Sequence, residues 1–134
     1  MGYFEPYPGT LGVQPPTDGL GTTYTARRLF IWSSIPPQAT FPSATGQAVH
    51  GVSGPDDSGG GAGTATRGLL ACKGRPFLVE AGTVQPINAG DALKAQVNGS
   101  LSGRVIPQAG SGTIVATALE GATNVGQLIW AVFV

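Results

Sequence analysis

The sequence has few of the side chains on which enzyme chemistry usually depends. Its 134 residues include one cysteine and one histidine, and only 10% are charged, with seven basic and seven acidic side chains that cancel. Soluble domains contain about 25% charged residues. A lone cysteine excludes an intrachain disulfide, and a chain without net charge has no overall electrostatic attraction to nucleic acid or to an anionic membrane. We therefore expect no nucleic-acid partner and no membrane partner.

The residues that chemistry requires do not form a recognisable site. We expect His50 to be a structural residue in a strand, and Cys72, in the apolar run 69–72, to be a buried small hydrophobe. One histidine and one cysteine do not make a zinc site. Asp56 and Asp57 stand among proline and glycine, where aspartate is a common turn former, and no calcium-loop spacing follows. The sequence predicts no enzyme, no catalytic residue, no metal site and no cofactor.

Long apolar runs and targeting segments are also missing. No stretch approaches the roughly 18 apolar residues of a membrane helix. The first six residues, MGYFEP, have neither the basic start nor the apolar stretch of a signal peptide. The sequence therefore predicts a soluble protein made in a cytoplasm.

What the sequence does contain is glycine, proline and short apolar runs. It has 22 glycines and 11 prolines, yet 41% of its residues are hydrophobic, which is too many for a disordered chain. No useful length shows a helical period, and turn signals recur about every 8–12 residues. We expect an all-β fold, a small β-sandwich or barrel, formed by residues 23–134 as one domain.

The turn residues divide this domain into short strands. Prolines break the chain within residues 35–45, and glycines make residues 53–63 a long loop, so both segments are expected to lack strands. A tight turn is expected at Gly74, and Asn98–Gly99 is the strongest hairpin signal. The expected strands are residues 23–25, 28–32, 47–52, 68–73, 76–81, 91–97, 104–106, 112–119 and 127–134.

The last strand is apolar on both faces. Leu128, Trp130, Val132 and Val134 alternate with Ile129, Ala131 and Phe133, and successive side chains of a strand point to opposite faces. Another sheet can cover one face, and a loop, a neighbouring subunit or a target protein can cover the other. The pattern favours an oligomer, with the interior of a sandwich as the alternative.

Residues 1–22 form a separate segment rich in proline and aromatic residues. Proline excludes a helix here, so the segment is expected to be an extended arm, partly polyproline II. A tail without a partner is one interpretation. Aromatic residues are uncommon in disordered tails, however, so we expect the arm to anchor in a groove on another chain. The residues expected to bind a partner are Tyr3, Phe4, Pro6, Tyr7 and Pro8 in the arm, and Trp130, Val132 and Val134 in the last strand.

Five segments in the second part of the chain match a known pattern in order and spacing. They are residues 46–52 (GQAVHGV), 87–93 (INAGDAL), 104–107 (RVIP), 112–122 (GTIVATALEGA) and 127–132 (QLIWAV), together with Asn98–Gly99. In these segments the chain resembles the decoration, or capsid cement, proteins of tailed-phage heads. The resemblance covers roughly residues 46–134.

The resemblance implies a structural virion protein on the outer surface of the capsid. It would bind the major capsid protein, stabilise the contacts between major capsid subunits, and form a homo-oligomer, a trimer or a dimer. The alternative is a carbohydrate- or receptor-binding β module of a phage tail or fibre. That function needs an exposed aromatic platform, and the two tryptophans, Trp32 and Trp130, lie in apolar strand runs where a core position is expected.

Overall fold

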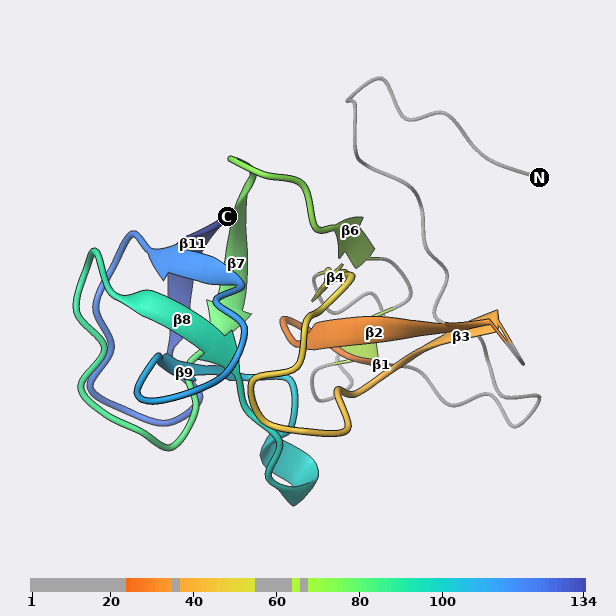
Figure 1. Cartoon of the computed structure of the whole chain (residues 1–134), viewed down its shortest axis with the longest axis horizontal. Helices are drawn as coiled ribbons and strands as arrows, with labels where there is room; N and C mark the ends of the chain where they lie inside the picture. The colour runs from red at the N-terminus through yellow and green to blue at the C-terminus, as the bar shows by residue number, and fades with distance from the viewer. Residues whose placement is uncertain (1–23, 35–36, 55–63, 66–67) are drawn as a thin grey trace.

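The chain folds into short β-strands. The computed structural model describes residues 24–34, 37–54, 64–65 and 68–134, and Figure 1 shows their arrangement. The predicted all-β fold is confirmed. In chain order the elements are β1 (Tyr24–Thr25), β2 (Leu29–Ser34), β3 (Pro37–Thr40), β4 (Gly51–Ser53), β5 (Thr64–Ala65), β6 (Gly68–Leu70), β7 (Pro76–Glu80), β8 (Ala92–Ala95), the 3-10 turn η1 (Gly99–Leu101), β9 (Val105–Pro107), β10 (Ala116–Ala118) and β11 (Leu128–Phe133).

Two sequence predictions fall on residues without a described structure. The extended arm at residues 1–22 and nearly all of the predicted loop at residues 53–63 lie outside the described residues. In the part of the chain that is described, no helix has the length and apolar character that a membrane span requires.

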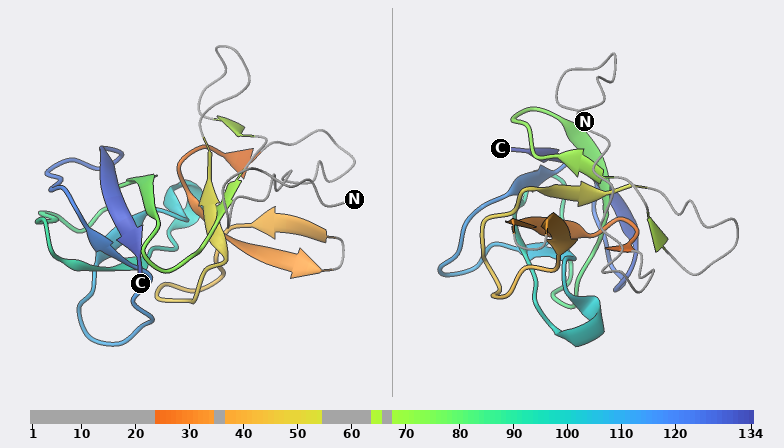
Figure 2. Two further views of the ribbon diagram at one scale, coloured as in Figure 1. Left: turned by 90° about the horizontal axis from the view of Figure 1, so that it is seen from above. Right: turned by 90° about the vertical axis from the view of Figure 1, so that its right-hand side faces the viewer.

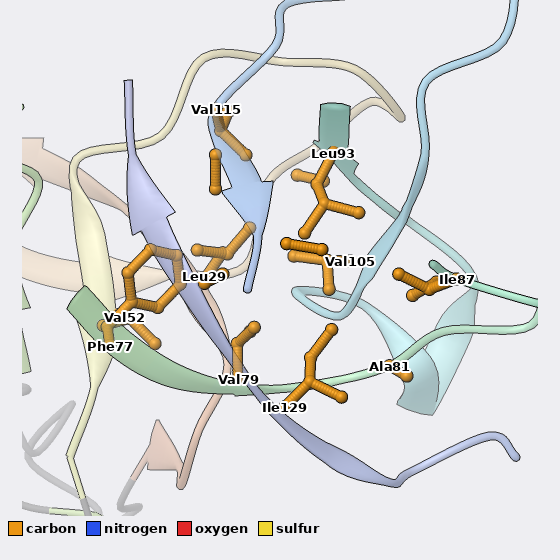
Figure 3. Close-up of a cluster of buried hydrophobic side chains, with 14 of the residues drawn as sticks. Leu29, Val52, Phe77, Val79, Ala81, Ile87, Leu93, Val105, Val115 and Ile129 are labelled. Atoms are coloured by element: carbon orange, nitrogen blue, oxygen red, sulfur yellow. The ribbon is translucent and has the colours of Figure 1, made fainter. Parts of the chain in front are cut away.

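The second half of the chain forms a small barrel. Five antiparallel strands pair in the order β7-β11-β10-β8-β9, and a bridge between Ala81, just after β7, and Val105 of β9 joins the two outermost strands. This one bridge brings the two ends of the curled sheet together at a single point. Side chains from its strands meet in the interior, among them Val79, Leu93 and Ile129, none of which is exposed to solvent. Figure 3 shows these side chains converging.

A second sheet packs beside the barrel and completes its core. Its strands pair in the order β3-β2-β4-β6, and Leu29 and Val52 belong to the same buried cluster as the barrel interior. Figure 2 shows the two sheets side by side. Phe30 lies across Gly51 and Gly68, where a Cβ atom on either glycine would stand 2.7 Å from the ring. Only glycine allows this close approach of ring and backbone.

A buried ion-pair cluster ties the second sheet to the barrel. Arg28, at the start of β2, donates from Nε to the Oε2 atom of Glu80 on β7 at 2.8 Å, and Arg104 donates from Nε to the same oxygen at 2.8 Å. The Nη1 atom of Arg28 also donates to the carbonyl oxygens of Ser100 and Ser102, both at 2.9 Å. Because Arg28 is only 5% exposed, these bonds satisfy a charge that burial would otherwise disfavour.

The predicted loop at residues 35–45 is wrong in part, because β3 (Pro37–Thr40) lies within it. This strand pairs antiparallel with β2, and Pro37 stands at its first position, opposite Ser34. Proline lacks the N–H group that a central strand needs for its ladder, but the first position of an outermost strand tolerates it. Pro37 therefore stands at the start of a strand, and the prolines of this segment do not indicate the absence of a strand.

The hairpin predicted at Asn98–Gly99 is present, but its connection is longer than a two-residue turn. Strands β8 and β9 pair antiparallel, and the amide of Gly103 donates to the carbonyl oxygen of Gln96 at 2.8 Å. Between these residues the chain forms η1, in which Gly99 has a φ of +52°. The hydroxyl of Ser102 accepts a hydrogen bond from the amide of Asn98 at 3.0 Å. This extra bond favours the longer loop.

Two further predictions are wrong because strands are shorter than their apolar runs. Strand β6 ends at Leu70, and Cys72 lies in the exposed connection to β7 instead of the core. His50 lies in an exposed bend just before β4 instead of within it. The turn predicted at Gly74 is confirmed, with a φ of +83°.

Candidate interaction surface

Strand β11 has one buried face and one exposed face, although both are apolar. Ile129, Ala131 and Phe133 are at most 2% exposed and belong to the core. On the opposite face Leu128 is 47% exposed and Trp130 is 42% exposed. The alternation predicted from the sequence therefore holds, and the described structure leaves the second face open to solvent. Val132 is half-buried on this face, and Val134, which follows the strand, is exposed.

Neighbouring strands widen this exposed face. Trp130 stands opposite Leu78 of β7, and on the other side the amide of Leu119 donates to the carbonyl oxygen of Trp130 at 2.8 Å. Leu119 is 50% exposed and Leu78 is half-buried. In the next row Val132 lies opposite Thr117 of β10. We call this surface the β11 face. It consists of Leu128, Trp130 and Val132 on β11, Leu78 on β7, and Thr117 and Leu119 in the β10 region.

The charged groups near the β11 face are held by other residues. Glu80 lies opposite Leu128 in the sheet, but Arg28 and Arg104 bind its carboxylate. A second carboxylate, that of Glu120, accepts a hydrogen bond from the backbone amide of Trp130 at 3.2 Å. The face is therefore bordered by charge and apolar at its centre, as a core-and-rim interaction surface requires.

A pocket of about 160 Å³ lies at the C-terminal end of β11. Residues 48–49, 71–73, 113–115 and 133–134 line it, so it sits where the connection before β4 and the connection before β7 meet the barrel. Phe133 forms part of the lining and is stacked on Phe77, with ring centroids 3.9 Å apart. Val134 lies beside both the pocket and the β11 face.

The structure brings three of the predicted partner-binding residues together. Trp130, Val132 and Val134 alternate along β11 and share its outer face. The core position expected for Trp130 is wrong, because this side chain points away from the barrel interior. The side chain of Trp32 is not among those described. The remaining predicted binding residues, Tyr3, Phe4, Pro6, Tyr7 and Pro8, also lie outside the described residues.

Sequence reasoning missed Leu78 and Leu119 as members of the face. The strand alternation of β7 contains a signal for Leu78, since Phe77 and Val79 are buried on its two sides. Leu119 has no such signal, because it follows the short strand β10 and reaches the face only through its pairing with Trp130. That contact depends on the register between strands, and the order of residues along one strand does not contain it.

Groups that could support chemistry are dispersed in the described structure. Among its residues, no three histidine, cysteine, aspartate or glutamate side chains gather where they could hold a metal ion. Burial lowers the pKa of the Arg27 guanidinium from its ordinary value, because desolvation disfavours the charged form. Arg27 is also the one described non-glycine residue with a left-handed backbone, at a φ of +59°.

Comparison with known proteins gives no relative. No protein-family model matches the chain, and neither the curated proteins nor the solved structures contain a significant match. The resemblance to capsid cement proteins therefore stays a prediction, and the functional argument depends on the surface itself.

Proposed function

We propose that this chain is a structural virion protein that binds the outside of a phage capsid and stabilises the contacts between major capsid subunits. The observation that carries the proposal is the β11 face, where Leu128 and Trp130 of β11 and Leu119, just after β10, are each at least 42% exposed. Large exposed apolar side chains that are contiguous mark interaction sites more often than scattered ones do.

The binding free energy that the β11 face can supply suits a protein that binds in many copies. Fully burying a large apolar side chain contributes about 1.5–3 kcal/mol, so burying the exposed half of each contributes roughly 1 kcal/mol. A few such side chains give only modest affinity for one site. On a symmetric shell, contacts repeat, and an oligomer that engages several sites at once binds far more tightly than one copy does. We therefore propose a homo-oligomer, a dimer or a trimer, as the binding unit.

The arm supplies a second set of contacts in this proposal. Tyr3, Phe4 and Tyr7 would be the aromatic anchors, and Pro6 and Pro8, whose rings restrict φ, favour an extended arm. An extended segment of this kind binds by adding a strand to a neighbour or by lying in a groove. In this proposal the β11 face packs on the shell and the arm reaches beyond it.

Co-sedimentation with the capsids of the phage that encodes the chain tests the proposal. We expect saturable binding of the full chain at about micromolar concentration and weaker binding of Trp130→Ser. A matched control is Val84→Ser, since Val84 is 47% exposed but lies in the connection between β7 and β8. If the full chain does not bind expanded capsids at this concentration, the proposal is wrong.

The exposure of Trp130 favours one other function, a carbohydrate- or receptor-binding module of a tail or fibre. An exposed tryptophan can stack on a sugar ring, and Trp130 is 42% exposed on the outer face of the sheet. A glycan array probed with the full chain and with Trp130→Ser separates the two functions. Binding to a glycan that is lost in the variant would support the module, and an array without binding would exclude it.

A further inference from the structure

The pocket at the end of β11 is open to solvent and has about the volume of one aromatic ring. A cavity of about 150 Å³ accepts benzene, and this pocket measures about 160 Å³. Most of its lining residues are apolar, among them Val49, Ile114, Val115 and Phe133. Ile114 is 45% exposed, so an occupant of the pocket would also cover apolar surface that is now in contact with solvent.

Lys73 brings a positive charge to the pocket, and none of the described lining residues has an acidic side chain. Lys73 is an exposed lining residue, and among the described residues the ion pairs involve Glu80 and the two arginines that hold it, not Lys73. The described part of the chain contains six of the seven basic side chains and three of the seven acidic ones, so 6 − 3 gives a net charge of +3. The rest of the chain, with one basic and four acidic side chains, carries 1 − 4, or −3.

The sequence contains one dipeptide with the complementary chemistry. Phe4 and Glu5 are the only place where an aromatic residue and an acidic residue are adjacent. They belong to residues 1–23, which hold two acidic side chains and no basic one. We propose that Phe4 and Glu5 dock in this pocket, with the Phe4 ring between the apolar lining residues and the Glu5 carboxylate beside the Lys73 ammonium.

The length of the connection between Glu5 and β1 indicates that the docked arm belongs to the same chain. Eighteen residues, 6–23, join Glu5 to β1. A segment of this length reaches up to roughly 60 Å when fully extended, so it is long enough to cross a small domain. A tether that matches the span gives an effective concentration of about millimolar. At micromolar protein, the chain's own arm therefore exceeds the arm of a second, unassociated copy by roughly a thousandfold.

This inference goes beyond the proposed function, since it concerns the free protein and needs no capsid. Docking of Phe4 would cover the exposed side chains of Ile114 and Val134 before any partner is met. The arm would be released where a partner competes for it. Failure of capsid binding would leave this docking untouched, and failure of docking would leave capsid binding untouched, so the two proposals are tested separately.

Cys72 reports whether the pocket is occupied. It is the only cysteine of the chain, it lines the pocket, and its exposed thiol can be labelled with a maleimide. In the full chain we expect Phe4→Ala to speed labelling at least about tenfold, the factor that the loss of one buried aromatic ring implies. Tyr7→Ala is the matched control and should leave the rate unchanged. Equal rates for wild type and Phe4→Ala would overturn the proposal, and a larger effect of Tyr7→Ala would assign the pocket to another ring.

A charge exchange identifies the ion pair and the source of the arm. Each labelling rate is divided by that of the same variant carrying Phe4→Ala, which removes the direct effect of residue 73 on the neighbouring thiol. In Glu5→Lys and in Lys73→Glu, the Cys72 thiol should lose its protection from labelling. In the double variant this protection should return. If the double variant stays unprotected, Glu5 does not contact Lys73. A mixture of the two single variants at micromolar concentration should stay unprotected, and protection in the mixture would show docking between copies and overturn the assignment to the same chain.

Discussion

The two faces of β11 have almost the same composition and different surroundings. The inner face consists of Ile129, Ala131 and Phe133, which the barrel buries, and the outer face carries Leu128 and Trp130, each more than 40% exposed. Inner residues contribute to the folding free energy because folding removes them from water. Outer residues contribute little until a second molecule covers them. The same strand therefore serves stability on one side and, in our proposal, binding on the other.

The largest effect is expected where the inner face is damaged. Ile129→Ala removes a side chain that is fully buried, and replacing such a residue by alanine costs about 2–5 kcal/mol through lost burial and the cavity that remains. Urea denaturation measures the change in the free energy of unfolding. Leu128→Ala, one residue away on the outer face, is the control and should cost about 0.5 kcal/mol or less. Similar losses for the two variants would remove the distinction between the faces.

A second prediction concerns Glu80, which lies on the outer face of the sheet but whose carboxylate is bound by other residues. Glu80 lies opposite Leu128, yet its side chain is only 21% exposed and binds two arginines. Glu80→Gln leaves Arg28 and Arg104 without a counter-charge, and breaking a buried pair in this way costs about 3 kcal/mol. Denaturation at neutral pH checks the value. A loss below about 0.5 kcal/mol would mean that solvent already screens both arginines.

The third prediction separates binding from folding. Leu119→Ser removes an exposed leucine that lies beside Trp130, so the free energy of unfolding should change by about 0.5 kcal/mol or less. If the β11 face binds the capsid, burying the exposed half of Leu119 contributes roughly 1 kcal/mol, and affinity should fall by about fivefold. Parallel denaturation and capsid-binding titrations give both numbers. Loss of stability without loss of binding would contradict the division between the faces.

The smallest effect is expected for exposed apolar residues away from the face. Val125 is 47% exposed, as Leu128 is, but it lies in the loop between β10 and β11. Val125→Ser should change neither the free energy of unfolding nor capsid affinity by more than about 0.5 kcal/mol. A binding defect as large as that of Leu119→Ser would show that the interaction surface extends past the β11 face.

Patterns along single strands were readable from the sequence. The alternation in residues 127–134 predicted a two-sided apolar strand, and Gly74 predicted a turn, because both features depend only on neighbouring residues. The prediction that failed for Trp130 needed the packing of the whole barrel. An apolar run indicates that a residue can be buried, but the side of the sheet that receives cover is decided by residues far away in the sequence, such as Leu29 and Val52.

Features formed between strands could not be predicted from the sequence. Leu119 meets Trp130 through strand register, and the pocket joins four separate segments of the chain. Cys72 was misplaced because the apolar run continues two residues past the point where β6 ends. In each case the deciding quantity is a contact over long sequence distance, which local pattern does not contain.

Closure of the barrel also determines how copies of this protein can meet. A flat sheet ends in two strands whose unpaired N–H and C=O groups offer a template for another chain, and such templates promote fibres and amorphous aggregates. Here the bridge between Ala81 and Val105 pairs the two outermost strands of the five-stranded sheet with each other. This bridge removes part of the template at the two ends of the five-stranded sheet, and β3 and β6, the outermost strands of the second sheet, are the edges at which strand addition remains open.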